Sequence, residues 1–350
     1  MTWAGKRRDM PELGKIDREF FDEYVYPHLG ADREDVTLGP QHGVDFGVVD
    51  VGDKAVAMAT DPIFIMPSLG FERAAWFAIH ILMSDVAVSG IPPSHLSVDF
   101  NLPPEITNEE FETVWETFDR EAEKYGVSVV TGHTGRYEGC NYPMVGGGTA
   151  VSVGEFDDLV RPDGARPGDR VVITKGPAIE ATGLLSIQFE SLMRGEMPDE
   201  DIDAAMDRFY DMSPVDDALT AAAAGPVTAM HDATECGIYG GLYEMARAAD
   251  VGIEIERDAV PVQPGVVEAC DFFGIDPWIS ISEGTVLAAV DPSGVDDVLD
   301  ALASEDIPAA DVGEITEGTG LVVDGEPTDH PGADPFWVAM AEYMERLQAE

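Results

Sequence analysis

The chain has 350 residues, of which 45% are hydrophobic, so it is long enough for two packed domains and is not composed like a disordered protein. Its 68 acidic residues against 20 basic ones give a formal net charge of −48, which makes nucleic acid and anionic membranes unfavourable partners. No signal-peptide core is present, and the most apolar segment, 74–83, is too short to span a bilayer. The three cysteines lack disulfide or zinc spacing. We therefore expect a cytoplasmic protein whose solvated acidic surface suits high salt.

The first half of the chain alternates predicted strands and helices. The strand at Lys54–Phe64 is expected to reach a turn at Pro62. Thr107 and Glu110 have the spacing of a capping box, and Gly126 ends the helix that they begin. We expect strands at 54–64, 127–132 and 143–156, and helices at 71–88 and 107–126.

The second half begins after a turn-rich segment that indicates an inter-domain linker. The predicted organisation is an N-terminal domain at 1–156, a linker at 157–168, a C-terminal domain at 169–332 and a closing helix at 333–350. Helices are expected near 178–190, 198–211, 214–224, 239–249 and 333–348, and strands near 170–176, 227–230, 252–256 and 285–290.

Three aspartates of the first domain stand at junctions with apolar strands or helices: Asp45, Asp61 and Asp85. A single Asp at such a place is more often a cap or a turn residue than a functional one. Asp85 differs because its apolar neighbours would bury it, and a buried carboxylate must be paired, protonated or bound to a cation. Since lysine and arginine are scarce, we expect Mg²⁺ to be the cation that binds this carboxylate.

Phosphate binding would then depend on Mg²⁺, backbone N–H groups and helix N-termini, because the chain has no Walker-type loop. The three glycines at 146–148 either let a ligand approach or mark a β-bulge. In the second domain, polar residues stand at three element ends, each of which is also explained by an ordinary cap or turn. They are Asp232, Thr234, Glu235 and Gly237; Glu283 and Gly284; and Lys175 and Glu180.

Taken in order from about Gly39 to Gly320, these stretches resemble the aminoimidazole ribonucleotide (AIR) synthetase superfamily. The matching motifs are a G-D-D-type strand (Asp45), a T-T-D turn (Thr60, Asp61), an N-D-x-A-x-x-G helix (Asp85, Ala87, Gly90), a G-D-T junction (Gly132, His133, Thr134), a D-x-T-x-G-G helix start (Asp232, Thr234, Gly237) and an E-G strand entry (Glu283, Gly284). The segment 241–255 is most similar to the hydrogenase-maturation branch, whose members dehydrate a carbamoylated thiol.

The resemblance implies an α+β protein of two domains, in which the N-terminal domain forms a homodimer through strands that close into a β-barrel and the C-terminal domain is α/β. It implies an enzyme that uses ATP and Mg²⁺ to phosphorylate an oxygen of a small-molecule substrate. By position, Asp45, Asp61 and Asp85 would hold the metal, Asp232 and Glu283 would be catalytic on the acceptor side, and Gly132, His133, Thr134, Arg136 and Lys175 would bind the nucleotide.

Three features depart from the family pattern. His133 replaces an expected Asp, and imidazole is a poor Mg²⁺ ligand, so either one metal contact is missing or His133 contacts phosphate directly. Cys236 replaces a glycine. The printed chain ends in ERLQAE, whereas the hydrogenase-maturation branch ends in a cysteine that carries the carbamoyl group.

Two other functions stay open on the sequence alone. One is a nucleotide-binding maturation or regulatory protein without turnover, and the other is a kinase similar to thiamine-monophosphate kinase. Selenophosphate synthetase is disfavoured because no reactive cysteine or glycine-rich arm precedes Asp45. The acidic composition favours a halophilic archaeal source.

Overall fold

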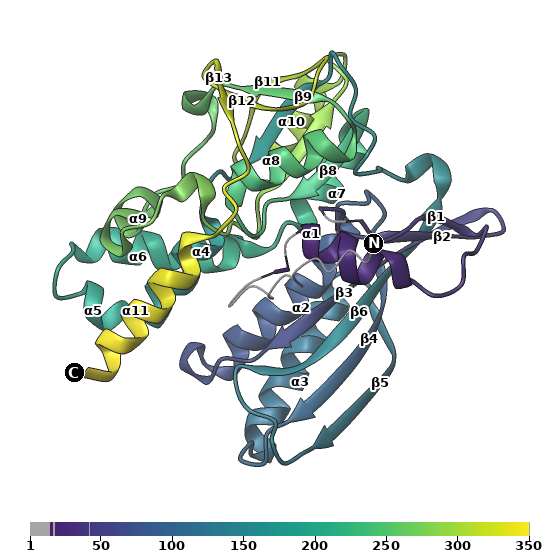
Figure 1. The fold of residues 1–350 in the computed structure, drawn as a ribbon. Coiled ribbons are helices and arrows are strands. Elements are labelled where there is room, and N and C mark those ends of the chain that lie inside the picture. The colour runs from purple at the N-terminus through teal and green to yellow at the C-terminus, as the bar shows by residue number, and fades with distance from the viewer. Residues whose placement is uncertain (1–14, 17, 42, 350) are drawn as a thin grey trace, which may run out of the picture.

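A computed structural model describes residues 15–16, 18–41 and 43–349, which form two domains (Figure 1). The N-terminal domain contains a six-stranded sheet in the order β1-β2-β3-β6-β4-β5, in which only β4 and β5 pair in parallel. Its strands are β1 (Val36–Leu38), β2 (Gly47–Val51), β3 (Lys54–Phe64), β4 (Pro93–Leu102), β5 (Ser128–Arg136) and β6 (Met144–Glu155). A short helix α1 (Arg18–Phe20) precedes the sheet, and the two long helices are α2 (Phe71–Ala87) and α3 (Asn108–Lys124).

Helices α2 and α3 cover one face of this sheet, as Figure 1 shows. The apolar composition of α2 buries it on most sides, and the leucine at position 82 lies against Gly148 of β6. A Cβ at Gly148 would approach Leu82 Cδ1 to 2.6 Å, so the glycine lets helix and sheet pack closely. The pairing of β3 with β6 shifts register beside Gly146, whereas Gly147 and Gly148 pair regularly with Pro62 and Asp61.

The capping box of α3 is confirmed. Thr107 Oγ1 accepts the Glu110 N–H at 3.2 Å, and the Glu110 carboxylate accepts the Thr107 N–H at 2.8 Å. Val114 and Phe118 are buried on the helix face that meets the sheet. The 3.6-residue apolar period therefore identified this helix and the face that packs.

Two local predictions were wrong. Pro62 does not end a strand, because β3 continues to Phe64 and Pro62 lies opposite Gly147 of β6. The strand predicted to end at Gly132 also continues, so His133, Thr134 and Arg136 lie within β5 rather than after it. In both places the neighbouring strand extends the pairing through residues with poor strand propensity.

The C-terminal domain follows a connection with a short 3₁₀ turn at Phe156–Asp158. Its strands are β7 (Arg170–Thr174), β8 (Val227–Asp232), β9 (Gly252–Ile255), β10 (Val286–Val290), β11 (Ala309–Thr316), β12 (Gly320–Val323) and β13 (Glu326–Thr328). Its helices are α4 (Ile179–Gln188), α5 (Glu190–Met193), α6 (Asp199–Asp207), α7 (Val215–Ala224), α8 (Gly237–Ala248), α9 (Val266–Phe273), α10 (Val295–Ser304) and α11 (Pro335–Ala349), with a 3₁₀ segment η5 (Arg208–Met212) after α6.

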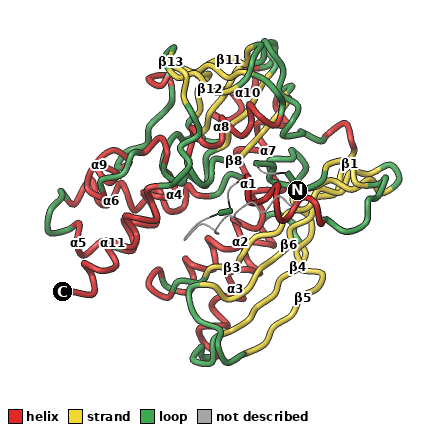
Figure 2. Tube along the Cα trace, viewed as in Figure 1, coloured by secondary structure: helices red, strands yellow, loops and turns green. Residues whose placement is uncertain are grey.

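These strands form a seven-stranded sheet in the order β13-β12-β9-β11-β7-β10-β8. Helix α8 packs on one face over a small apolar core, while α7 and α10 belong to the larger core on the other face. Helices α4, α6, α9 and α11 gather beside the sheet, as the red tubes in Figure 2 show. The α+β class is confirmed, but the C-terminal domain is not a parallel α/β sheet, because only β9 and β12 pair in parallel.

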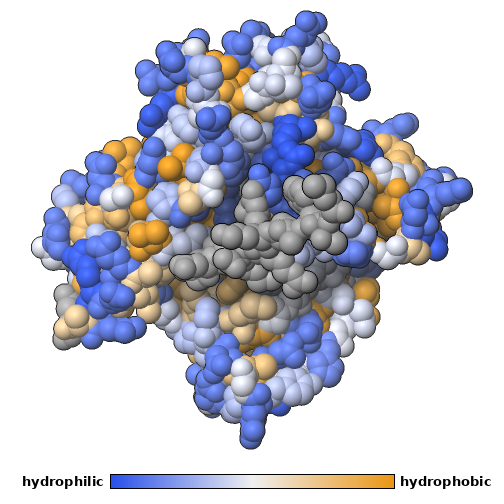
Figure 3. Space-filling model, in the orientation of Figure 1, coloured by the Kyte–Doolittle hydropathy of each residue, from blue (hydrophilic) through white to orange (hydrophobic). Residues whose placement is uncertain are grey.

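The six-stranded sheet does not close into a barrel within one chain, since β1 and β5 stand at its two ends. Its outer side exposes apolar residues, among them Val130 and Met144. The face of the molecule in Figure 3 is mainly hydrophilic, with small apolar patches. Among the described residues, no helix has both the length and the apolar character needed to cross a membrane.

Candidate functional site

Acidic side chains from both domains converge where the domains meet. Those of the N-terminal domain come from the loop before β2 (Asp45), from β3 (Asp61) and from α2 (Asp85). Those of the C-terminal domain come from the end of β8 (Asp232) and from the turn before β10 (Glu283). The five residues predicted as metal-binding or catalytic are thus electrostatic neighbours, although 238 positions (283 − 45) separate the first from the last.

Asp45 is joined to the C-terminal domain by an ionic triad. Nδ1 of His231 lies 2.7 Å from Asp45 Oδ2, and its Nε2 lies 3.3 Å from Glu244 Oε2. Burial lowers the pKa of His231, but the two carboxylates outweigh burial and raise the pKa well above its ordinary value. The charged, imidazolium form of His231 is therefore favoured. The loop carrying Asp45 comes close to α8 at Gly43, where a Cβ would lie 2.9 Å from Glu244 Cβ.

Asp61 and Asp85 form a close carboxyl pair beside this triad. Burial raises the pKa of Asp61, and a hydrogen bond with Asp85 acts in the opposite direction. Burial also raises the pKa of Asp85 well above its usual range, and the negative charges of Asp61, Asp232 and Asp45 raise it further. The protonated form of Asp85 is therefore favoured more strongly than that of an exposed aspartate.

The two acids of the C-terminal domain are more deeply buried than Asp45, Asp61 and Asp85. Glu283 is 2% exposed and Asp232 is 1% exposed. Burial and the charges of Asp232 and Glu180 raise the pKa of Glu283 well above its ordinary value. Burial raises the pKa of Glu180 to about 8, and the Glu283 backbone N–H, 3.2 Å from Glu180 Oε2, lowers it. Glu180, Asp232 and Glu283 are therefore neighbouring carboxyl groups whose pKa values are all raised.

One ammonium reaches the cluster from the start of the described chain. Lys15 Nζ lies 3.1 Å from Thr234 Oγ1, and the Lys15 backbone N–H donates to both oxygens of Glu235. Burial lowers the pKa of Lys15, but Asp85 and other carboxylates outweigh burial and raise it. Lys15 therefore carries a positive charge into the site.

The donor set fits a hard divalent cation. Within the part of the chain that the structure describes, Asp61 Oδ2, Asp232 Oδ2 and Glu283 Oε1 are buried and lack a hydrogen-bond partner. Single ligand atoms of Asp45, His231 and Asp232 lie within 4.8 Å of one another. Buried carboxylate oxygens without partners are costly unless a cation or a proton satisfies them, and Mg²⁺ prefers such oxygen ligands. His231 fits as an ion-pair partner better than as a ligand, because both of its nitrogens face carboxylates.

The predicted nucleotide residues of the first domain lie elsewhere on the sheet. Asp61 is opposite Gly148, Gly148 is opposite Val98, and Val98 is opposite Gly132. Gly132 is thus three strands from Asp61, a distance of about 14 Å at ordinary strand spacing. His133 and Thr134 follow on the same exposed strand.

The side chains of this strand make contacts of their own. His133 Nε2 lies 2.6 Å from Tyr137 Oη, and Arg136 donates to the Ile106 carbonyl at 2.7 Å. Within one chain, Gly132, His133, Thr134 and Arg136 are therefore not brought to the carboxyl cluster.

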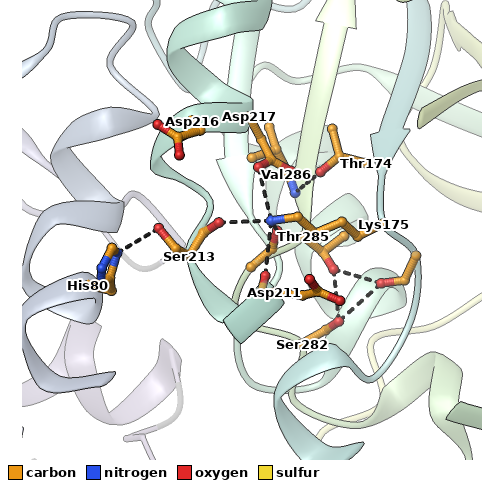
Figure 4. Close-up of polar contacts among 12 residues, drawn as sticks. His80, Thr174, Lys175, Asp211, Ser213, Asp216, Asp217, Ser282, Thr285 and Val286 are labelled. Carbon is orange, nitrogen blue, oxygen red and sulfur yellow. Dashed lines mark hydrogen bonds and ion pairs between the residues drawn. The ribbon is translucent and has the colours of Figure 1, made fainter. Parts of the chain in front are cut away.

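Lys175 has a different environment from the one expected of a nucleotide-binding residue. Its ammonium lies 2.8–3.1 Å from the carbonyl oxygens of Asp211, Ser213 and Gly284, and 2.9 Å from Asp217 Oδ2 (Figure 4). These contacts use all three ammonium hydrogens. They hold η5, α7 and the turn at Gly284 together, so Lys175 positions the turn that carries Glu283, and its contacts do not support nucleotide binding.

Sequence reasoning missed three participants: His231, Glu244 and Lys15. His231 directly precedes Asp232, and a histidine beside a candidate catalytic acid is a usable signal. Glu244 lies on the helix that follows, where it looks like any surface acid. Lys15 gave no signal, because nothing in the sequence connects the start of the chain to residue 234.

The fold and the site together define a two-domain protein with a cluster of acidic side chains between an N-terminal and a C-terminal domain. Residues 43–154 match the N-terminal domain, and residues 166–326 the C-terminal domain, of the AIR synthase related proteins. The chain belongs to this family, which confirms the resemblance found in its sequence.

Several relatives are carbamoyl dehydratases. The chain is 30% identical to carbamoyl dehydratase HypE of Rhizobium leguminosarum bv. viciae over 76% of this chain and 75% of that protein. It is 28% identical to HypE of Escherichia coli K12 over 92% of this chain and 94% of that protein. The crystal structure of E. coli HypE, a hydrogenase maturation protein, superposes with a TM-score of 0.67 at 27% identity, covering 80% of this chain and 87% of that chain. AaThiL complexed with AMPPCP and TMP shares the fold, with a TM-score of 0.67 at 23% identity over 82% and 89% of the two chains.

Proposed function

We propose that the chain is an ATP- and Mg²⁺-dependent enzyme that phosphorylates an oxygen of a small-molecule acceptor, in the manner of the carbamoyl dehydratases that it resembles. The observation that carries the proposal is the convergence of five carboxyl groups from two domains, three of them with buried oxygens that lack hydrogen-bond partners. Structural neighbours include HypE in complex with ATP, at a TM-score of 0.63. That complex shows the fold in a nucleotide-bound state.

In this proposal the carboxylates divide into two groups. Asp45, Asp61 and Asp85 would hold Mg²⁺, which supplies positive charge against the polyphosphate when bound. Asp232 and Glu283 would face the acceptor, and the Lys175 contact with the Gly284 carbonyl would hold their turn in place. The acceptor oxygen forms a bond to the γ-phosphorus, the bond from that phosphorus to ADP breaks, and ADP leaves with the electron pair.

The nucleotide-binding role of His133, Thr134 and Arg136 requires a second copy of the chain in this proposal. The strand β5 that carries them ends the sheet and exposes Val129 and Val130. A homodimer formed through this sheet would cover these residues, and it would place β5 of one chain near the site of the other. Light scattering on wild type and on Val130→Glu tests this: a dimer that the charge dissociates supports it, and a monomeric wild type contradicts it.

Release of ADP tests the reaction. The protein is incubated with ATP and Mg²⁺ alone and with a panel of amides, carbamoylated thiol peptides and thiamine monophosphate, and ADP is measured. Acceptor-dependent ADP formation that is lost in Asp232→Asn supports the proposal. Tight ATP binding without ADP across the panel would instead support a regulatory nucleotide-binding protein.

A further inference from the structure

We propose that Lys15 is a movable counter-ion of the site: its ammonium neutralises the carboxyl cluster when no divalent cation is bound, and it contacts the polyphosphate once the metal–nucleotide complex is present. The second half of this proposal rests on the proposed function. The first half concerns the cluster alone and can be tested without nucleotide.

The contacts of Lys15 place it at the cluster from outside both domains. Its backbone N–H is 3.1 Å from Glu235 Oε2, which fixes the backbone at the rim, and Nζ is 3.1 Å from Thr234 Oγ1. Thr234 lies two residues after Asp232, at the mouth of the acidic site. The carboxylates whose negative charges act on the ammonium are Asp85, Asp232, Glu244 and Asp61, which come from both domains.

A divalent cation bound by Asp61 and Asp85 would be attracted by the same carboxylates that attract the Lys15 ammonium. Asp61 and Asp85 are among the carboxylates whose charges act on the Lys15 ammonium, so a cation that they bind repels the ammonium and disfavours its present position. Among the described residues, the hydrogen bond of Lys15 Nζ is to a hydroxyl, and the four-carbon stem of lysine is flexible. The ammonium can therefore leave the carboxylates while the backbone stays on Glu235.

Once it leaves the carboxylates, the Lys15 ammonium can contact the triphosphate of the bound nucleotide. A triphosphate is strongly anionic, and ammonium groups bind phosphate oxygens through charge-assisted hydrogen bonds. Other cations of the described chain near the domain interface are engaged: His231 with Asp45 and Glu244, and Lys175 with three carbonyls and Asp217. Lys15, by contrast, contacts the hydroxyl of Thr234 through its ammonium, so its release leaves these described ion pairs intact.

The test compares Lys15→Met with a matched control, Lys54→Met. Lys54 pairs with Glu155 at the other end of β3, seven residues from Asp61 and so about 23 Å away. Removing its charge changes the net charge of the protein equally without touching the site. Lys15→Arg, which keeps the charge, is the rescue variant. Circular dichroism confirms that all variants are folded.

Electron paramagnetic resonance measures the binding of Mn²⁺ in the absence of nucleotide, which tests whether Lys15 neutralises the carboxyl cluster. We expect Lys15→Met to bind Mn²⁺ about tenfold more tightly than wild type, since a competing cation is removed, and we expect the arginine and Lys54→Met variants to match wild type. Equal Mn²⁺ affinity in Lys15→Met and wild type would overturn the counter-ion role.

Calorimetry with a non-hydrolysable ATP analogue and saturating Mg²⁺ measures the second half. We expect about tenfold weaker binding to Lys15→Met, with recovery in Lys15→Arg. Unchanged analogue affinity in Lys15→Met would overturn the phosphate contact. If wild type binds no analogue, the proposed function fails, while the Mn²⁺ measurement still decides whether Lys15 is the counter-ion.

Discussion

Replacing His231 by glutamine tests the ionic triad at the domain interface. The imidazolium lies 2.7 Å from Asp45 and 3.3 Å from Glu244, which corresponds to attractions of about 6 and about 5 kcal/mol at an effective dielectric constant near 20. Desolvation of three buried charges opposes most of this gain, and removal of one partner from a buried pair typically costs about 3–5 kcal/mol. We expect His231→Gln to lose that much free energy of unfolding, because Asp45, Asp232 and Glu244 then repel one another.

Urea unfolding of the EDTA-treated protein at fixed KCl measures the loss, and Mg²⁺ supplies a second condition. Because a divalent cation can replace the missing positive charge, saturating Mg²⁺ should recover a large part of the lost stability in the variant. His28→Gln, at an exposed histidine, is the control and should be neutral. A loss below about 1 kcal/mol in His231→Gln would refute the charged triad, since it would mean that the three carboxyls need no cation.

Three further predictions concern Asp61, the pH dependence of stability and the effect of salt. Asp61→Asn should weaken binding of Mg²⁺-ATP by about tenfold or more while circular dichroism stays unchanged, because the amide keeps the shape and removes the charge; unchanged affinity in calorimetry would remove Asp61 from the site. The folded pKa values of Asp45 (about 6) and Glu180 (about 8) lie above those of the unfolded chain, so the stability that these groups contribute is greatest below about pH 4 and is lost as pH rises through 6 and then 8. Melting temperatures in EDTA should therefore fall from pH 5 to 8.5, and Mg²⁺ should raise them more at pH 8 than at pH 6; a flat profile would contradict this. With 68 acids against 20 bases, the melting temperature should also rise from dilute buffer to molar KCl, and a flat or falling midpoint would argue against adaptation to high salt.

The sequence predicted the acids of the site better than their partners. Asp85 was singled out because its apolar neighbours would bury it, so its charge needs an explanation, whereas Asp61 was assigned from the family motif that it matches. His231 and Glu244 could not be assigned, because their function depends on which loop of the other domain lies against them. The distance from Asp45 to His231 along the chain is 186 residues, and no local pattern reports such a contact.

In the fold, too, features set by neighbouring residues were predicted, and features set by distant strands were not. Helix α3 was recognised with its cap, because capping chemistry and the 3.6-residue period are local. Strand β5 was predicted too short, since Gly132 and Gly135 look like strand breakers until β4 pairs with them. The mostly antiparallel pairing of the C-terminal sheet was missed, because alternation of strands and helices is compatible with either direction.

The separation of Asp45 from His231 also has a consequence during synthesis. The N-terminal domain, which carries Asp45, Asp61 and Asp85, emerges from the ribosome before the histidine that pairs with Asp45 has been made. At about 5–20 residues per second, the 186 residues between them take roughly 10–40 s to make. For that interval these three acids of the nascent domain lack the C-terminal side chains that surround them in the complete protein. A metal ion captured then would be the first partner of these acids, and the second half of the protein would later assemble around it.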